Sequence, residues 1–194
     1  NDVLIGNGHS LNKMDLSFLK KEYCFSMNRI SLGFDHLNFL PTYYTCVNPL
    51  VIEQSANNIK EISCPNFIST KGIDNFPWKD DIIFIDTKNY NQKFTEDPLY
   101  GVCEGYTVTY FTLQLAFFMG FQKVILIGID HDFATKGEPN KIVTSNGQDL
   151  NHFDPNYFGP GTKWQLPDLK NSEYFYQLAD DYYQTSGREI VDAT

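Results

Sequence analysis

Short apolar runs recur along the chain and are separated by longer segments of mixed polarity. Seven of these runs are rich in β-branched and aromatic residues, which is typical of strands buried on both faces of a sheet. Strands that alternate with helices predict a doubly wound, mostly parallel α/β sheet of the Rossmann-like type. The predicted strands are Asp2–Ile5, Tyr23–Met27, Tyr43–Val47, Asn66–Ser69, Ile82–Asp86, Lys123–Gly128 and Glu189–Val191, and the predicted helices are 15–21, 49–60, 106–120 and 171–186.

The pattern changes between residues 132 and 169, where Gly, Pro, Asn and Asp are frequent and no periodicity is sustained. A stretch of this length without regular structure is typical of a lid or a binding loop. Its scattered aromatic residues favour a lid that orders over a ligand. The 194 residues, 42% of them hydrophobic, suit one domain with a full core. We expect a single domain over 1–194, excised from a longer chain, with its lid at about 132–169.

The first predicted strand runs directly into Gly6-Asn7-Gly8. This is the pattern of a buried strand that turns sharply into a helix, with Ser10 as the expected cap. Glycine allows the close approach and the positive φ that such a turn needs, and a helix start offers unpaired N–H groups with a partial positive charge. Nucleotide phosphates are the usual occupants of this motif. A tight turn without a ligand is the alternative interpretation.

Asparagine follows three successive predicted strands, at Asn7, Asn28 and Asn48. Ligands of open α/β sheets bind beyond the carboxyl ends of the strands. An asparagine side chain both donates and accepts hydrogen bonds, which suits phosphate, ribose and a base edge. Any one of the three could instead be a turn-forming residue. Their equivalent positions favour a shared ligand.

Two carboxylates, Asp130 and Asp132, follow the strongest predicted strand. They could hold a divalent cation such as Mg²⁺ on a nucleotide diphosphate. Alternatively, Asp130 alone orders the neighbouring loops or the substrate by accepting hydrogen bonds from backbone N–H groups. The pattern itself leaves both interpretations open.

His152 lies within the predicted lid and could act as a general base, because histidine exchanges protons near neutral pH. The alternative is a histidine packed on Tyr157 or Phe153. His36 has no supporting context and is expected at the surface.

The composition limits the partners. A net charge of −9 and a pI near 4.8 argue against nucleic acid, whose phosphates need clustered Lys and Arg. A small anion held by backbone N–H groups is compatible with this charge. Four widely spaced cysteines predict free thiols in a reducing compartment, hence the cytoplasm. No apolar run is long enough to span a bilayer. We expect that any peripheral association with a membrane would involve regions outside this sequence.

With these positions assembled, the chain resembles the bacterial sialyltransferases of the Campylobacter lipooligosaccharide type. It also resembles the wider group related to the motility-associated factors and the archaeal hydroxymethylpterin diphosphokinase. The ordered set covers about residues 2–133. Its elements are Gly6-Asn7-Gly8-His9-Ser10-Leu11, Asn28, Val47-Asn48-Pro49-Leu50 with Glu53-Gln54, Thr107 at a helix start, and Met119-Gly120-Phe121-Gln122-Lys123-Val124 leading to Gly128-Ile129-Asp130.

This resemblance implies a sialyltransferase-like glycosyltransferase of bacterial polysaccharide biosynthesis. Such an enzyme moves a sugar from a nucleotide-activated donor, with CMP as the candidate carrier, to a glycan or glycoconjugate acceptor. It implies one inverting displacement without a metal, with His152 as the base and Tyr157 assisting departure of the phosphate. In this interpretation, Asp130 orders the loops at the strand ends or the donor. A tyrosine follows Gly-Ile-Asp in the sialyltransferases, where this chain has Asp132 or Phe133. The nucleotide-binding residues that the resemblance implies are Asn7, Gly8, Asn28, Asn48 and Thr107, and the pattern of the glycine turn adds Gly6 and Ser10.

Two further interpretations stay open. One is a diphosphokinase-like enzyme that uses ATP and a pterin, with Mg²⁺ on Asp130 and Asp132. The other is a non-catalytic module that binds a nucleotide or a glycan.

Overall fold

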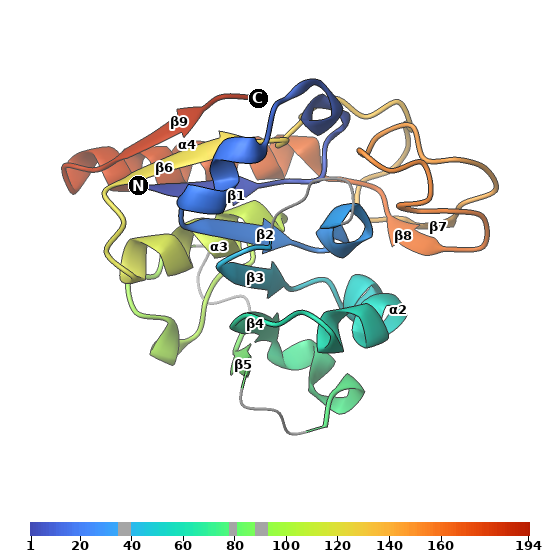
Figure 1. Ribbon diagram of the computed structural model, residues 1–194, viewed down its shortest axis with the longest axis horizontal. Coiled ribbons are helices and arrows are strands. Elements are labelled where there is room, and N and C mark those ends of the chain that lie inside the picture. The colour runs from blue at the N-terminus through green and yellow to red at the C-terminus, as the bar shows by residue number, and fades with distance from the viewer. Residues whose placement is uncertain (35–39, 78–80, 88–92) are drawn as a thin grey trace.

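Seven parallel strands form one sheet (Figure 1). The computed structural model describes residues 1–34, 40–77, 81–87 and 93–194, so His36 lies outside the described residues. The sheet order is β5-β4-β3-β2-β1-β6-β9, and the predicted fold class is confirmed, with each strand within one residue of its predicted ends. The strands are β1 (Asp2–Ile5), β2 (Cys24–Met27), β3 (Tyr43–Cys46), β4 (Asn66–Ser69), β5 (Ile82–Ile85), β6 (Lys123–Ile127) and β9 (Glu189–Asp192).

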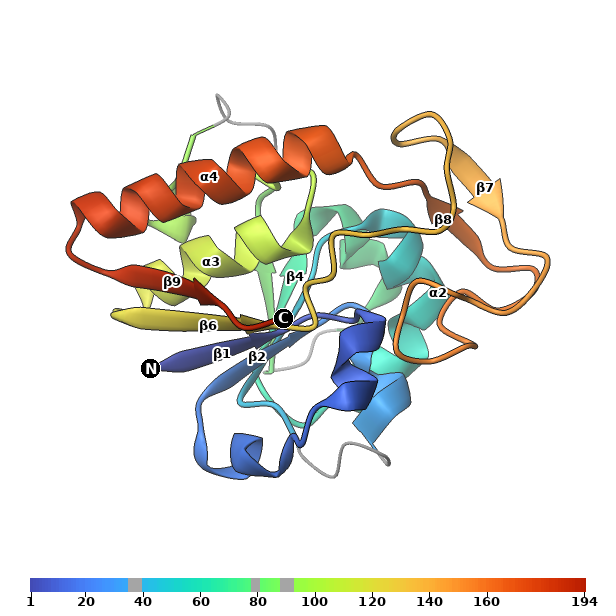
Figure 2. The ribbon, with the colours of Figure 1, turned by 90° about the horizontal axis from the view of Figure 1, so that it is seen from above.

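Helices cover both faces of the sheet (Figure 2). Alternate residues of β1 point to opposite faces: Ile5 packs with α2 (Pro49–Lys60) in one cluster, and Leu4 packs with α3 (Val108–Phe118) in the other. The helix α4 (Leu169–Thr185) packs against α3 and β9, in the same cluster as α3. The order of the strands reverses its direction of growth between β1 and β6, which is where ligands of such sheets bind.

The helix α3 begins and ends as the sequence predicts. Thr107 is its N-cap and accepts a hydrogen bond from the Thr109 amide, and Gly120 follows the helix with a φ of +86°. Residues Thr109 to Phe117 are all buried, whereas Phe118 is half exposed. The reason is that α3 packs against β1, β2 and β3 and also against α4 and Phe94, so it has little solvent-facing side.

The helix predicted at 15–21 is a short 3₁₀ helix, η2 (Ser17–Lys21), and the glycine turn leads into another, η1 (His9–Lys13). So few residues favour 3₁₀ geometry, because the nucleus of an α-helix is costly. The remaining 3₁₀ helices are η3 (Ile30–Gly33), η4 (Thr70–Asn75) and η5 (Pro98–Tyr100).

The glycines of the first turn are needed for close approach and not for an unusual φ. The expected positive φ is wrong, since Gly8 has a φ of −70° and neither Gly6 nor Gly8 has a left-handed backbone. A Cβ on Gly6 would lie 2.1 Å from the carbonyl oxygen of Gly128, and one on Gly8 would lie 2.2 Å from Cγ of Asp130. The turn is therefore pressed directly against the end of β6.

The segment expected to lack regular structure contains a small antiparallel sheet of β7 (Ile142–Thr144) and β8 (Lys163–Gln165). Figure 1 shows this segment beyond the carboxyl ends of the parallel strands. Its aromatic residues extend the core cluster under α2, and we call residues 132–168 the lid from here on. The buried aromatic side chains of the lid are Phe153, Tyr157, Phe158 and Trp164.

All four cysteines are free thiols, as the sequence predicts. Within the described ranges, no helix combines the length and the apolar character needed to cross a membrane.

The close packing at Gly6 predicts a strong response to one added methyl group. We expect Gly6→Ala to lower the free energy of unfolding by about 1–3 kcal/mol, because backbone and not a flexible side chain must move. Gly147→Ala is the matched control, since nothing lies within 4 Å of its Cβ position, and it should change stability by less than about 0.5 kcal/mol. Urea unfolding of the two variants checks this, and equal midpoints would contradict it.

Asp2 predicts a pH dependence of stability. It is fully buried at the start of β1, and this burial raises its pKa from 3.8 to about 7. The folded chain therefore binds a proton that the unfolded chain releases, so stability should fall as the pH rises from about 4 to about 7. A shift of about three units corresponds to on the order of 4 kcal/mol. Urea unfolding across this range should give a flatter pH profile for Asp2→Asn than for the unchanged chain, and an equally steep profile would count against the prediction.

Candidate functional site

Two adjoining cavities, of about 480 and about 150 Å³, lie at the carboxyl ends of the strands and beneath the lid. They share part of their lining and so form one crevice. The larger cavity extends toward α2 and β8. The smaller cavity lies between the segments that follow β1 and β6. The shared lining includes Asn28, Tyr106, Thr107, Phe133, His152 and Tyr157.

The glycine turn lines the smaller cavity, as predicted for Gly6, Asn7 and Gly8. The side-chain amide of Asn7 donates to the Met27 carbonyl at 3.1 Å. Its Oδ1 atom is buried without a hydrogen-bonding partner among the described residues. Because an unmatched buried acceptor costs free energy, Asn7 would gain from a ligand that donates a hydrogen bond.

Asp130 serves the neighbouring loop, which is the second of the two interpretations offered for it. Its carboxylate accepts hydrogen bonds from the Ser10 amide at 2.9 Å and the Ser10 hydroxyl at 2.5 Å, and its Oδ2 atom lies 3.0 Å from Nδ1 of His9. The expected N-cap role of Ser10 is therefore wrong, since Gly8 occupies that position and Asp130 holds the Ser10 hydroxyl. Ser10 lines neither cavity, whereas Asp130 lines the smaller one.

The two residues of the alternative metal site, Asp130 and Asp132, have different surroundings: Asp130 lines the smaller cavity and binds Ser10, whereas Asp132 lines neither cavity. Asp132 is exposed, and within the described ranges no group of three or more His, Cys, Asp or Glu side chains could hold a metal ion.

The other two strand-end asparagines differ from each other. Asn48 is the N-cap of α2: its Oδ1 accepts from the amides of Leu50 and Val51, and its Nδ2 donates to Gln165 of β8 at 2.7 Å. Its side chain is thus already engaged, as the turn-forming interpretation predicts. Asn28 lines both cavities and has a φ of +54°.

Backbone strain is concentrated in the larger cavity. Among the described residues, Asn28, Tyr106 and Asn140 are the non-glycine residues with left-handed φ values, and all three line this cavity. Such conformations persist only where the surrounding structure enforces them, and they gather at functional sites.

His152 combines with Asp149, a residue that the sequence analysis missed. The Nδ1 atom of His152 lies 2.8 Å from Oδ2 of Asp149, and the two side chains are 11% and 2% exposed. Burial alone would raise the pKa of Asp149. The hydrogen bond from His152, its charge, and the amides of Asn151 and Phe158 outweigh burial and lower this pKa. No described residue bonds to Nε2 of His152, so this nitrogen is available to the crevice that His152 lines.

The backbone of His152 is fixed to the glycine turn. His152 forms an antiparallel bridge with Gly8, and the Phe153 amide donates to the Asn7 carbonyl at 2.9 Å. On its other side, the imidazole stacks on Tyr157 with ring centroids 3.9 Å apart and planes 7° apart. The packed-histidine interpretation therefore describes this geometry too, with Tyr157 as the support and Asp149 as the hydrogen-bonding partner.

Tyr157 lies under His152 and is almost fully buried. Its hydroxyl lies 3.5 Å from the Arg29 amide, and its carbonyl accepts from the Arg29 guanidinium. Burial raises the pKa of Tyr157 well above its ordinary value. These contacts make Tyr157 a support for the imidazole.

One ion pair borders the larger cavity, between Lys71 and Glu104 at 2.8 Å. Lys71 follows β4, and Glu104 precedes α3. Neither residue stands out in the sequence, since the two meet only through the fold. For Asp149 the sequence offered a weak signal, the spacing Asp149-x-x-His152.

No family model matches this chain, and no curated protein matches it. Among solved structures, the fold is similar to that of a MAf glycosyltransferase from Magnetospirillum magneticum AMB-1, with a TM-score of 0.56 and 14% sequence identity. The match covers 95% of this chain and 30% of the other, so this chain spans less than a third of that protein's length. At this identity the likeness concerns the fold alone. It supports the Rossmann-like class, and it agrees with the resemblance to the motility-associated factors only as far as the fold is concerned.

The contacts of Asp149 predict a loss of stability that depends on pH. Asp149→Asn should cost about 1–3 kcal/mol at neutral pH, because three donors lose a charged acceptor. A carboxylate whose pKa is lower in the folded chain than in the unfolded chain stabilises the fold at pH values above its ordinary pKa. This stabilisation is lost as the pH falls through the lowered pKa. The difference between the unchanged chain and Asp149→Asn should therefore narrow on acidification, as measured by urea unfolding. Asp132→Asn, at an exposed position of the same segment, is the control that should stay unchanged, and a pH-independent difference would refute the prediction.

Proposed function

We propose that this chain is a glycosyltransferase domain that moves a sugar from a nucleotide-activated donor to an acceptor hydroxyl. The observation that carries this proposal is the pairing of Asp149 with His152 at the crevice. An imidazole whose Nδ1 is held by a carboxylate keeps Nε2 ready to accept a proton. A polar crevice at the carboxyl ends of parallel strands is the usual place for a nucleotide ligand.

The donor phosphate is proposed to bind at the first turn of α3. Thr107 and Val108 line both cavities there, and the start of an 11-residue helix carries partial positive charge and N–H groups without intrahelical partners. Asn7 and Asn28 face the same crevice from the ends of β1 and β2 and would hold the hydroxyl groups of the donor. Gly6 and Gly8 allow the turn to pack against Gly128 and Asp130, and this packing sets the position of Asn7.

In the proposed reaction, the acceptor oxygen attacks the anomeric carbon while Nε2 of His152 takes the hydroxyl proton. The bond between the anomeric carbon and the phosphate oxygen breaks, and the nucleotide leaves with the electron pair. This single displacement inverts the anomeric centre. The proposal includes no metal: the partial positive charge of the helix start stabilises the departing phosphate, and Asp130 acts by ordering the turn that leads into η1.

Two further observations support the proposal without deciding its details. The solved structure with a similar fold is named as a glycosyltransferase. The resemblance to the sialyltransferases favours CMP as the carrier nucleotide, with a glycan or glycoconjugate as acceptor.

Replacing His152 should separate binding from turnover. We expect His152→Ala to lower the release of CMP from a CMP-linked sugar by about 10²- to 10⁴-fold, the usual contribution of general acid–base help. The affinity for the nucleotide should stay within about twofold, since the proposed phosphate site lies on α3. Isothermal titration calorimetry (ITC) measures the affinity, and a turnover assay with and without EDTA measures the release of CMP.

A thermal-shift screen of the unchanged chain against CMP, UMP, GDP and ATP, with and without Mg²⁺, identifies the nucleotide first. A ligand that binds only the folded state at about a hundredfold excess over its Kd stabilises it by about 2.7 kcal/mol. Near-full turnover by His152→Ala would remove this residue from the mechanism. Stabilisation by ATP that requires Mg²⁺ would favour the diphosphokinase alternative, and nucleotide binding without any transfer would favour a non-catalytic module.

A further inference from the structure

Tyr106 has an unusual backbone conformation at the edge of the crevice. Its φ is +61°, it follows Gly105 with a φ of +58°, and its side chain is 50% exposed although it lines both cavities. Asparagine, found at the other two strained positions of the larger cavity, adopts this conformation readily. A bulky aromatic residue does so rarely, at a cost of about 1–2 kcal/mol. Neither this cost nor the exposure of the ring serves the stability of the fold.

The turn that carries Tyr106 is pressed onto the core. A Cβ on Gly105 would lie 2.3 Å from Tyr110 and 3.0 Å from Phe175. The ring of Tyr106 then rests against Phe175, with centroids 6.0 Å apart and planes 35° apart. The ring is therefore supported on its core side and open on the side of the crevice.

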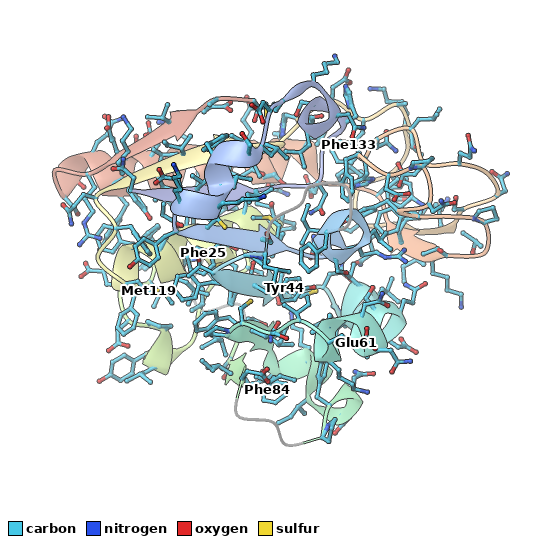
Figure 3. The ribbon with its side chains drawn as sticks, viewed as in Figure 1. Phe25, Tyr44, Glu61, Phe84, Met119 and Phe133 are labelled. Carbon is cyan, nitrogen blue, oxygen red and sulfur yellow. The ribbon has the colours of Figure 1, made fainter. Side chains whose placement is uncertain are left out.

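The position of this ring relates it to the proposed phosphate site. Tyr106 directly precedes Thr107 and Val108 at the start of α3, so a ligand with its phosphate there has its nucleoside close to Tyr106. Phe133, labelled in Figure 3, lines both cavities from the beginning of the lid. A flat ligand between the two cavities therefore has an aromatic residue on the α3 side and another on the lid side.

We propose that Tyr106 stacks on the nucleobase of the donor and that its left-handed backbone is retained for this purpose. This inference rests on the proposed function and assigns one specificity-determining residue to it. Stacking of a base on an aromatic side chain tolerates any base, because every base has a flat π-face. Tyr106 therefore distinguishes nucleotides from phosphorylated sugars that lack a base.

The experiment compares CMP with ribose 5-phosphate, which retains the ribose and phosphate but has no base. Tyr106→Gly should raise the Kd for CMP by about 5- to 150-fold, from the usual strength of base stacking, and leave the Kd for ribose 5-phosphate within about twofold. Tyr106→Phe keeps the ring and should bind CMP like the unchanged chain. Because glycine adopts a left-handed φ without strain, the melting temperature of Tyr106→Gly should not fall. ITC and thermal unfolding measure these quantities.

Tyr174→Ala is the matched control. Tyr174 is 57% exposed and contacts the same Phe175 ring, with centroids 5.2 Å apart, but it lies on α4 and lines neither cavity. Its loss should leave the Kd for CMP unchanged.

The outcomes separate this inference from the proposed function. If the unchanged chain binds CMP and Tyr106→Gly binds it equally well, the stacking role is refuted while the proposed function stands. An equal loss for CMP and ribose 5-phosphate also refutes stacking, since the substitution then alters the phosphate site. If the unchanged chain binds neither CMP nor any other nucleotide, the proposed function and this inference fail together.

Discussion

The structure depends on one close contact between the turn after β1 and the end of β6. Gly8 packs against Asp130 with no space for a Cβ, and Asp130 in turn holds Ser10 by two hydrogen bonds. This contact fixes the backbone of residues 6 to 10 at the place where the sheet changes its direction of growth. The same backbone then pairs with the lid at His152 and Phe153. Backbone packing at the centre of the sheet thus determines where the imidazole of the lid lies.

The sequence predicts the sheet well and the crevice only in part. The strands are recognisable because runs such as Val3-Leu4-Ile5 are apolar on both faces, which is a local property. Helix α2 is predicted to the residue, since Asn48 and Pro49 mark its start. The lid is predicted as a segment, but β7 and β8 have only three residues each, which is too few to produce a recognisable alternation.

The residues that the sequence analysis missed are those defined by contacts across the fold. Lys71 and Glu104 are 33 positions apart and meet only because β4 and the turn before α3 are neighbours. The strain at Tyr106 has no signature in the residue types around it. Conversely, Asn48 matches the strand-end pattern as well as Asn7 does. Its side chain is nevertheless engaged, because Oδ1 accepts from the first turn of α2 and Nδ2 donates to Gln165. A residue type at a suitable position indicates a candidate, and the hydrogen bonds decide whether its polar atoms are available.

The bridge between Gly8 and His152 has a consequence for the cycle of the proposed enzyme. An activated sugar donor is vulnerable to attack by water, and an exposed base next to it would waste the donor. The bridge joins the proposed base to the turn after β1, so any movement that lifts this part of the lid and admits solvent would also carry the imidazole away from a bound donor. In the proposed enzyme, proton abstraction would therefore require the bridge to be formed, and this requirement would protect the donor against unproductive hydrolysis.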